Sequence, residues 1–213
     1  MALSLLTVFL LQSQPYSAAA ADGKEAEVKR RRGFPALAGD TTIIRTVWTN
    51  IPIFIQKGGK KMEEVRERFM REALALAREA GQAGEVPVGC VIVREGRIVG
   101  RGRNRREEKR SALSHAETEA IAQANEALGS WRLEDCELYV TLEPCPMCAG
   151  AILNARIPRV WYGARDRAFG ACGGVMNLFM EAFPHPPALT GGVLEAECQE
   201  VLRRFFADLR ENG

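Results

Sequence analysis

The sequence lacks a strong charge bias, a dense set of cysteines and internal repeats. Its formal net charge is +2; residues 1–61 hold nine basic and four acidic side chains, which leaves 20 basic and 23 acidic ones to residues 62–213. A nucleic-acid surface must therefore be a local patch. Six cysteines in 213 residues are too few for a disulfide framework. The length suits one enzyme domain of ordinary size.

The first sixty residues differ from the remainder. Residues 1–11 are apolar but too few to span a bilayer, and Ala18–Ala21 resembles a signal-peptide cleavage site without the basic segment that should precede it. We expect residues 1–61 to be an extension that matches no family, disordered or translated from a start codon assigned too far upstream, with Met62 as the native initiator. The alternative is a secretory signal. No membrane segment is expected.

Hydrophobic periodicity divides residues 62–213 into alternating helices and strands. Helices are expected over about 63–80, 114–128, 147–154, 175–180 and 195–209, and strands over 88–94, 97–104, 137–142 and 157–162. Glu95-Gly96 predicts a tight hairpin turn. Ser114 is expected to cap its helix with Glu117 at the third position, as in a capping box. These elements predict one α/β domain over residues 62–213, with a mixed sheet covered on both faces.

Two motifs carry the chemistry: His115-Ala116-Glu117, and Cys145 with Cys148 in Pro-Cys-Pro-Met-Cys. One imidazole and two thiolates can hold a zinc ion and leave a fourth position for water, as in catalytic zinc sites. The zinc lowers the pKa of bound water. The Glu117 carboxylate can take the water's proton, deliver it to a ring nitrogen and then protonate the departing ammonia. H-x-E followed by P-C-x-x-C is the signature of zinc deaminases. The motifs predict hydrolytic deamination of a nucleobase.

Each of these residues also has a structural explanation. A lone Cys-x-x-Cys is more often half of a structural zinc site or a redox pair, although Pro144 and Pro146 do not fit a redox context. A structural zinc needs a fourth ligand, for which Cys172 or His185 is available. The cysteines outside the motif are expected to be small buried apolar residues, with a secondary possibility that Cys172 lies near the site: Cys90, Cys136, Cys172 and Cys198.

From about Met62 to its C-terminus the sequence resembles the bacterial tRNA-specific adenosine deaminase family of the cytidine/deoxycytidylate deaminase superfamily. The resemblance lies in Val86-Pro87-Val88-Gly89, Gly102-Arg103-Asn104-Arg105, His115-Ala116-Glu117 and residues 139–151 and 162–166. It implies a three-layer αβα cytidine-deaminase-like fold, one Zn2+ per subunit, and conversion of adenosine to inosine at the wobble position of an arginine tRNA. It also implies a homodimer that binds the anticodon stem-loop. The cysteine usage indicates a reducing compartment, and we expect the cytoplasm.

The resemblance assigns roles to single residues. The zinc ligands would be His115, Cys145 and Cys148, and Glu117 would be the proton shuttle. The residues near the extruded base would be Asn104, which hydrogen-bonds the adenine, Val88 and Leu142, which lie close to it, and Asp166, which contacts the anticodon-loop backbone. Two positions depart from the pattern: Arg106 stands where some members carry proline, and Ser111 where some carry aspartate.

The basic run Arg101–Arg110 bears on the choice of substrate. It holds six basic residues against Glu107 and Glu108 and leads directly to His115. A run of this kind is more often a solvated loop than a binding surface. The alternative function is deamination of guanine or another free nucleobase by the same fold, and such an enzyme has no use for the run. An enzyme that acts on tRNA should lose activity steeply as salt rises.

Overall fold

The computed structural model describes residues 42–44, 53–55 and 59–212, with the side chains of residues 62–211. The strands β1 (Thr42–Ile44) and β2 (Ile53–Ile55) form a two-stranded sheet. The apolar run 1–11 and the alanine cluster 18–21 lie outside the described residues. The assignment of residues 1–61 as an extension that matches no family stays a prediction.

A five-stranded mixed sheet forms the centre of the domain, in the order β4-β3-β5-β6-β7. Its strands are β3 (Gly89–Arg94), β4 (Arg97–Arg103), β5 (Cys136–Leu142), β6 (Arg159–Ala164) and β7 (Ala188–Thr190). β3 runs antiparallel to β4 and β5, while β5, β6 and β7 are parallel. The turn between β3 and β4 has φ values of 50° at Glu95 and 74° at Gly96, as a tight two-residue hairpin requires. The predicted hairpin and mixed sheet are confirmed.

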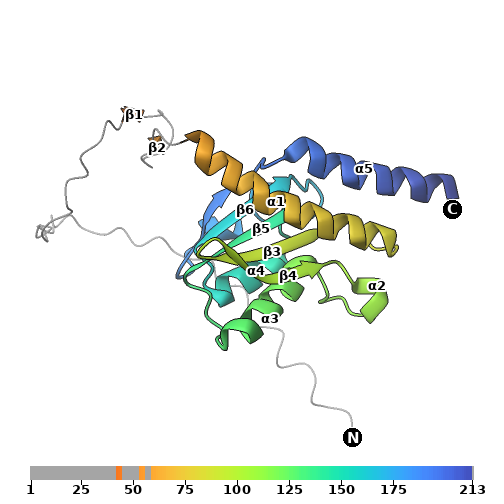
Figure 1. The fold of residues 1–213 in the computed structure, drawn as a ribbon, viewed down its shortest axis with the longest axis horizontal. Helices are drawn as coiled ribbons and strands as arrows, with labels where there is room; N and C mark the ends of the chain where they lie inside the picture. The colour runs from red at the N-terminus through yellow and green to blue at the C-terminus, as the bar shows by residue number, and fades with distance from the viewer. Residues whose placement is uncertain (1–41, 45–52, 56–58, 213) are drawn as a thin grey trace, which may run out of the picture. The chain divides into compact units, whose positions relative to one another are not determined.

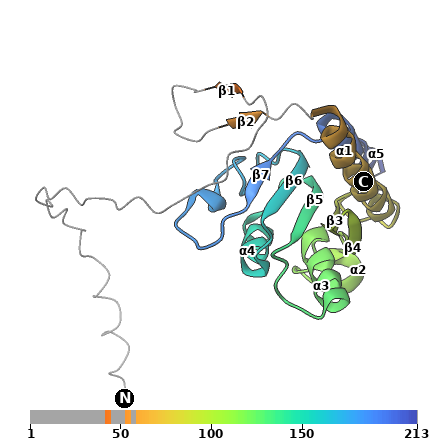
Figure 2. The ribbon, with the colours of Figure 1, turned by 60° about the vertical axis from the view of Figure 1, so that its left-hand side comes forward.

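Helices cover both faces of this sheet, which gives three layers (Figures 1 and 2). α1 (Gly59–Gln82) and α5 (Glu195–Asn212) lie on one face, and α3 (Ala116–Leu128) and α4 (Pro146–Ala155) on the other. Side chains of β5 alternate between the layers: Leu138 and Val140 belong to the core beside α3 and α4, and Tyr139 contacts Phe69 of α1. The expected αβα architecture is confirmed. In the described ranges no helix has both the length and the hydrophobicity to cross a bilayer.

Gly102 allows α3 to lie directly on β4. A Cβ atom at this position would collide with the backbone of Ala116 and Ala120. The face of α3 toward the sheet consists of small side chains, and Ala116, Ala120 and Ala124 are fully buried. This close approach fixes the first turn of α3, which carries Glu117, against the end of β4, where Asn104 follows.

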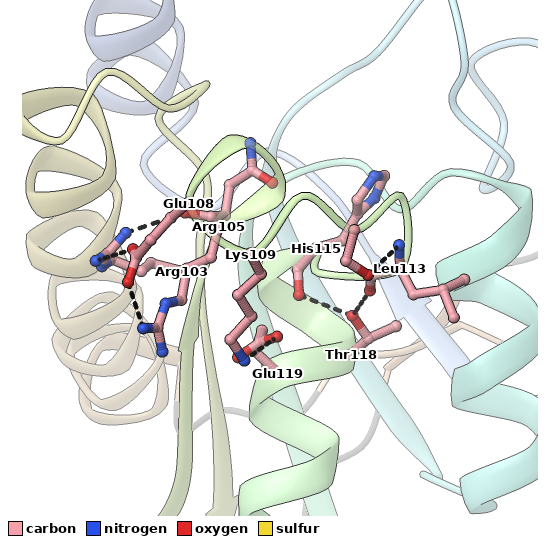
Figure 3. A network of polar contacts seen from close by, with 10 residues as sticks. Arg103, Arg105, Glu108, Lys109, Leu113, His115, Thr118 and Glu119 are labelled. Carbon is pink, nitrogen blue, oxygen red and sulfur yellow. Dashed lines mark hydrogen bonds and ion pairs between the residues drawn. The ribbon is translucent and has the colours of Figure 1, made fainter.

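The start of α3 differs from the expected capping box. The N-cap is His115, with φ −82° and ψ 158°, so Glu117 is the second helical residue and not the third. Ser114 lies one residue before the N-cap and is buried, and its carbonyl accepts the backbone N–H of Arg105 at 3.0 Å. The Thr118 hydroxyl supports the turn instead, 2.9 Å from the carbonyl oxygen of His115, as Figure 3 shows.

Two other expectations need correction. The helix expected over 175–180 is only the short 3-10 turn η1 (Leu178–Met180), which the Asn177 side chain caps by accepting the N–H of Phe179. The strand expected over 157–162 lies two residues later, as β6. Two elements were not expected: β7, which follows a proline-rich loop, and the four-residue helix α2 (Arg106–Lys109), which lies inside the basic run.

Candidate active site

Two helix starts bring the predicted metal ligands together. His115 is the N-cap of α3, Cys145 is the N-cap of α4, and Cys148 lies in the first turn of α4. Pro146 occupies the first turn of α4, where proline needs no N–H partner. The Nδ1 atom of His115 lies 3.7 Å from the Sγ atom of Cys145 and 3.5 Å from that of Cys148. The three residues form a metal group whose ligand atoms all lie within 4.8 Å of one another.

The spacing of the metal group fits zinc. Tetrahedral Zn–S and Zn–N bonds of ordinary length place nitrogen and sulfur about 3.6 Å apart, which matches the two His115–cysteine distances. Cys148 is fully buried, and His115 and Cys145 are half-buried and line a cavity. Among the described residues no fourth ligand joins the group; neither Cys172 nor His185 belongs to it. This set favours a catalytic zinc with one open position over a closed structural site.

The two cysteines of the metal group differ in their pKa values. Hydrogen bonds from the Cys148 thiol and from His115 lower the pKa of Cys145 to about 4, whereas the pKa of Cys148 is raised by its interaction with the Cys145 sulfur. The pKa of His115 is raised because its ring hydrogen-bonds to Cys145. Both sulfurs must be thiolates to ligate zinc, so binding the metal releases the proton that Cys148 holds.

Glu117 lies beside the metal group without belonging to it. Its side chain is 4% exposed and lines the same cavity as His115 and Cys145. Burial raises the pKa of this carboxyl group to about 7. A group with a pKa near neutrality can both accept and return a proton at physiological pH, which is what general acid–base catalysis requires.

The cavity has a volume of about 800 Å³, and all four residues expected near the base line it: Val88, Asn104, Leu142 and Asp166. Asn104 is 5% exposed, and its Oδ1 atom has no hydrogen-bond partner among the described residues. An unpaired buried acceptor costs about 1–3 kcal/mol, so proteins rarely keep one without a use for it. The structure brings these residues to one cavity but does not test their roles.

Comparison with known proteins decides the family. Residues 63–164 match the family model of the cytidine and deoxycytidylate deaminase zinc-binding region. The tRNA-specific adenosine deaminase of Bacillus subtilis (strain 168) is 47% identical over 146 residues, which make up 68% of this chain and 91% of that protein. The chain belongs to the tRNA-specific adenosine deaminase family. It is therefore a zinc-dependent deaminase, and the metal group is the part of the chain placed to hold the zinc.

Solved structures agree with this assignment. A structure from a study of A-to-I editing by deaminases at the wobble position of transfer RNA has a TM-score of 0.62 and 46% identity, and the match covers 63% of this chain and 99% of that one. The guanine deaminase from Nitrosomonas europaea has a TM-score of 0.60 at 25% identity, over 66% of this chain and 84% of that one. The fold is therefore shared by enzymes that differ in substrate.

Glu143 is a buried residue of the deaminase whose role the sequence reasoning missed. Its side chain is 2% exposed and follows β5 directly. Its carboxylate accepts the backbone N–H groups of Asp166 at 3.0 Å, Cys172 at 2.9 Å and Gly174 at 2.7 Å. A Cβ atom at Gly174 would lie 2.7 Å from this carboxylate, so the 165–174 loop is folded tightly around it. Glu143 thus holds the loop that carries Asp166.

Glu85 is a second missed residue, with a similar arrangement. It is 2% exposed, and its carboxylate accepts the backbone N–H groups of Glu107 at 3.3 Å and Glu108 at 2.9 Å. It therefore fixes α2, whose first residue, Arg106, lines the cavity of the deaminase. The only signal for either glutamate in the sequence is an acidic residue beside an apolar strand, a pattern that a solvated position also fits.

The basic run Arg101–Arg110 is largely neutralised. Glu108 pairs with both Arg103 and Arg105, and Lys109 pairs with Glu119 at 2.7 Å, as Figure 3 shows. Arg101 lies 3.8 Å from Glu72. Within the described ranges, Arg106 and Arg110 of the run form no ion pair, and only Arg106 lines the cavity. The run contains no continuous free basic patch, and Arg106 is its residue at the cavity.

Proposed function

We propose that this deaminase converts adenosine to inosine at the wobble position of a tRNA, with an arginine tRNA as the substrate that the family resemblance implies. The names of the 46–47% identical relatives, tRNA-specific adenosine deaminase, support this choice. The observation that carries it is the meeting of three features in one cavity: the metal group, the buried Glu117, and the unpaired amide oxygen of Asn104.

In this proposal Glu117 moves the protons of the reaction. His115, Cys145 and Cys148 would hold the zinc, which would supply an activated water nucleophile at neutral pH. The Glu117 carboxylate accepts one proton of this water and delivers it to a ring nitrogen of the base. It then takes the remaining proton of the added water and transfers it to the departing amine, which leaves as ammonia. Burial, which raises the pKa of Glu117 to about 7, keeps both protonation states accessible through the cycle.

The remaining cavity residues select the base and its context. The Oδ1 atom of Asn104, which otherwise lacks a hydrogen-bond donor among the described residues, accepts a hydrogen bond from an N–H group of the adenine. Val88 and Leu142 provide apolar walls beside the ring, and Asp166 faces the loop backbone next to the reacting nucleotide. An unpaired nucleotide of an anticodon loop costs less to extrude than one in a duplex, which suits an enclosed site of this kind.

We also propose that the enzyme works as a homodimer in the cytoplasm and binds the anticodon stem-loop near the subunit interface. The dimer follows from the family resemblance, and light scattering at working concentration tests it by giving twice the chain mass. The cytoplasm is supported by the cysteines, which are all free thiols, because such thiols and a thiolate-zinc site suit a reducing compartment. Fractionation of cells that make the natural protein tests the compartment.

The direct test is incubation of the purified zinc protein with an arginine tRNA transcript that carries adenosine at the wobble position. Sequencing of the reverse-transcribed product should show inosine at that position and at no other adenosine. A matched transcript with cytidine at the wobble position should give no ammonia. Absence of inosine in the first transcript would contradict the proposal.

A second candidate is deamination of free guanine, which the likeness to the Nitrosomonas europaea guanine deaminase favours. Both enzymes would use zinc and a glutamate, so loss of activity in a Glu117 variant does not separate them. Salt does: activity on tRNA should fall as ionic strength rises from 50 to about 200 mM because phosphate contacts release counterions. Rapid, salt-independent ammonia release from guanine, without inosine in tRNA, would establish the second candidate.

A further inference from the structure

Phe169 is an exposed aromatic residue at the wall of the cavity. Its side chain is 70% exposed, yet it is one of the residues that line the cavity. Within the described ranges its ring takes part in none of the aromatic pairs or cation–π contacts. The ring therefore presents an accessible π face next to the position where the reacting base would enter.

The backbone that carries Phe169 is firmly held. The Asp166 carboxylate accepts the N–H of Ala168 at 2.8 Å and that of Phe169 at 3.1 Å. The N–H of Asp166 in turn donates to the buried Glu143, and the N–H of Gly170 donates to the Asp166 carbonyl at 3.1 Å. Because hydrogen bonds fix the chain on both sides of Phe169, its exposure belongs to a defined turn.

The chemistry of the cavity divides into a deep part and a rim. Glu117 and Asn104 are almost completely buried, so the reacting base must reach inward to contact them. The rim carries Phe169 and the exposed Arg106, which forms no ion pair within the described ranges. A base that reaches the deep part leaves the nucleotides on either side of it near the rim. RNA loops are commonly recognised by stacking of such bases on aromatic side chains.

We propose that Phe169 is a stacking platform for the nucleobase next to the reacting adenosine in the RNA, and so strengthens the binding of the RNA loop. The inference rests on the proposed function, because a free purine has no neighbouring base and would leave this ring unused. Stacking on an aromatic side chain tolerates every base but favours those with larger π faces.

The test compares wild type, Phe169→Leu and Phe169→Tyr on three anticodon stem-loop RNAs: unmodified, abasic at the nucleotide 5′ of the wobble adenosine, and abasic at the nucleotide 3′ of it. Phe169→Leu keeps apolar bulk but loses the π face, and it should raise KM on unmodified RNA about 10- to 100-fold, with kcat within twofold of wild type. Phe169→Tyr should behave like wild type. On one of the two abasic RNAs, wild type and Phe169→Leu should become equal.

Phe183 offers a matched control, because it is 49% exposed but does not line the cavity. Phe183→Leu should leave KM unchanged on all three RNAs. An active wild type whose KM does not respond to Phe169→Leu overturns the inference and leaves the proposed function intact, whereas an inactive wild type refutes both. A KM difference that persists undiminished on both abasic RNAs also overturns it, as does a change of oligomeric state in Phe169→Leu by light scattering, which would assign the ring to a protein contact.

Discussion

The floor of the cavity and its rim are built in different ways. The floor consists of the metal group and Glu117, which come from two short motifs at the starts of α3 and α4. The rim consists of α2 and the 165–174 loop, each tied to a buried glutamate 22 to 31 residues away in sequence. Local sequence therefore places the metal group and Glu117, and long-range hydrogen bonds place the rim residues that we propose contact the substrate.

Substitutions in the two regions should therefore have different effects. Loss of a residue on the floor removes the reaction and leaves the fold and substrate binding in place. Loss of an anchor under the rim shifts a loop, which weakens binding and lowers stability while the metal stays bound. Four variants, two of them with matched partners, test this contrast.

Glu117→Gln should have the largest effect, because it removes the proton carrier from the floor. General acid–base groups contribute about 10²–10⁴-fold to rate, and kcat on an anticodon stem-loop should fall by this factor. Zinc content by atomic absorption and KM should stay near wild type, since Glu117 is not part of the metal group. A variant that loses its zinc would show that Glu117 helps to hold the metal, which would contradict the assignment of Glu117 to proton transfer alone.

Asn104→Ala tests a buried residue of the cavity that should matter for activity alone. The kcat/KM for RNA should fall roughly 10- to 100-fold, which corresponds to the loss of one or two hydrogen bonds to the base. Its Oδ1 atom has no partner among the described residues, so removing the amide leaves no new unpaired group there. The Tm by calorimetry should change little. A large fall in Tm would show that Asn104 supports the fold and not the substrate.

Glu143→Gln should damage the rim. The amide replaces one acceptor oxygen with a donor that faces a backbone N–H, and the lost charge-assisted bonds are worth about 1.5–3 kcal/mol. The Tm should fall by roughly 3–12 °C, and KM for the stem-loop should rise while zinc content stays constant. Glu85→Gln is the matched variant: it affects two hydrogen bonds and not three, so its Tm should fall less. The reverse order would contradict the anchoring account.

Arg106→Gln should have the smallest effect, visible mainly in the salt dependence. If Arg106 contacts one phosphate, its removal should reduce the slope of log(kcat/KM) against log[salt] by about one. Arg103→Gln is the control, because Arg103 is already paired with Glu108, and the slope should not change. Equal slopes for wild type and both variants would exclude Arg106 from phosphate binding.

The sequence predicts the floor well and the rim poorly, for physical reasons. Helices and the hairpin follow from hydrophobic periodicity and turn residues, and metal ligands follow from fixed spacing, all of which are local. The capping role assigned to Ser114 was wrong because α3 begins one residue later than expected, with His115 as its N-cap. The strand β7 depends on parallel pairing with β6 across an intervening loop. Glu85 and Glu143 bind backbone groups, whose positions no residue pattern encodes.

The 165–174 loop wraps around Glu143, and this packing limits the substitutions that the loop can accept in evolution. Gly170 and Gly174 leave no room for a side chain against that carboxylate, so these three positions must be kept or altered together. Phe169 directly precedes Gly170, and its side chain is 70% exposed. A substitution at Phe169 therefore leaves the packing around Glu143 intact, so this position can change while its neighbours in the loop cannot.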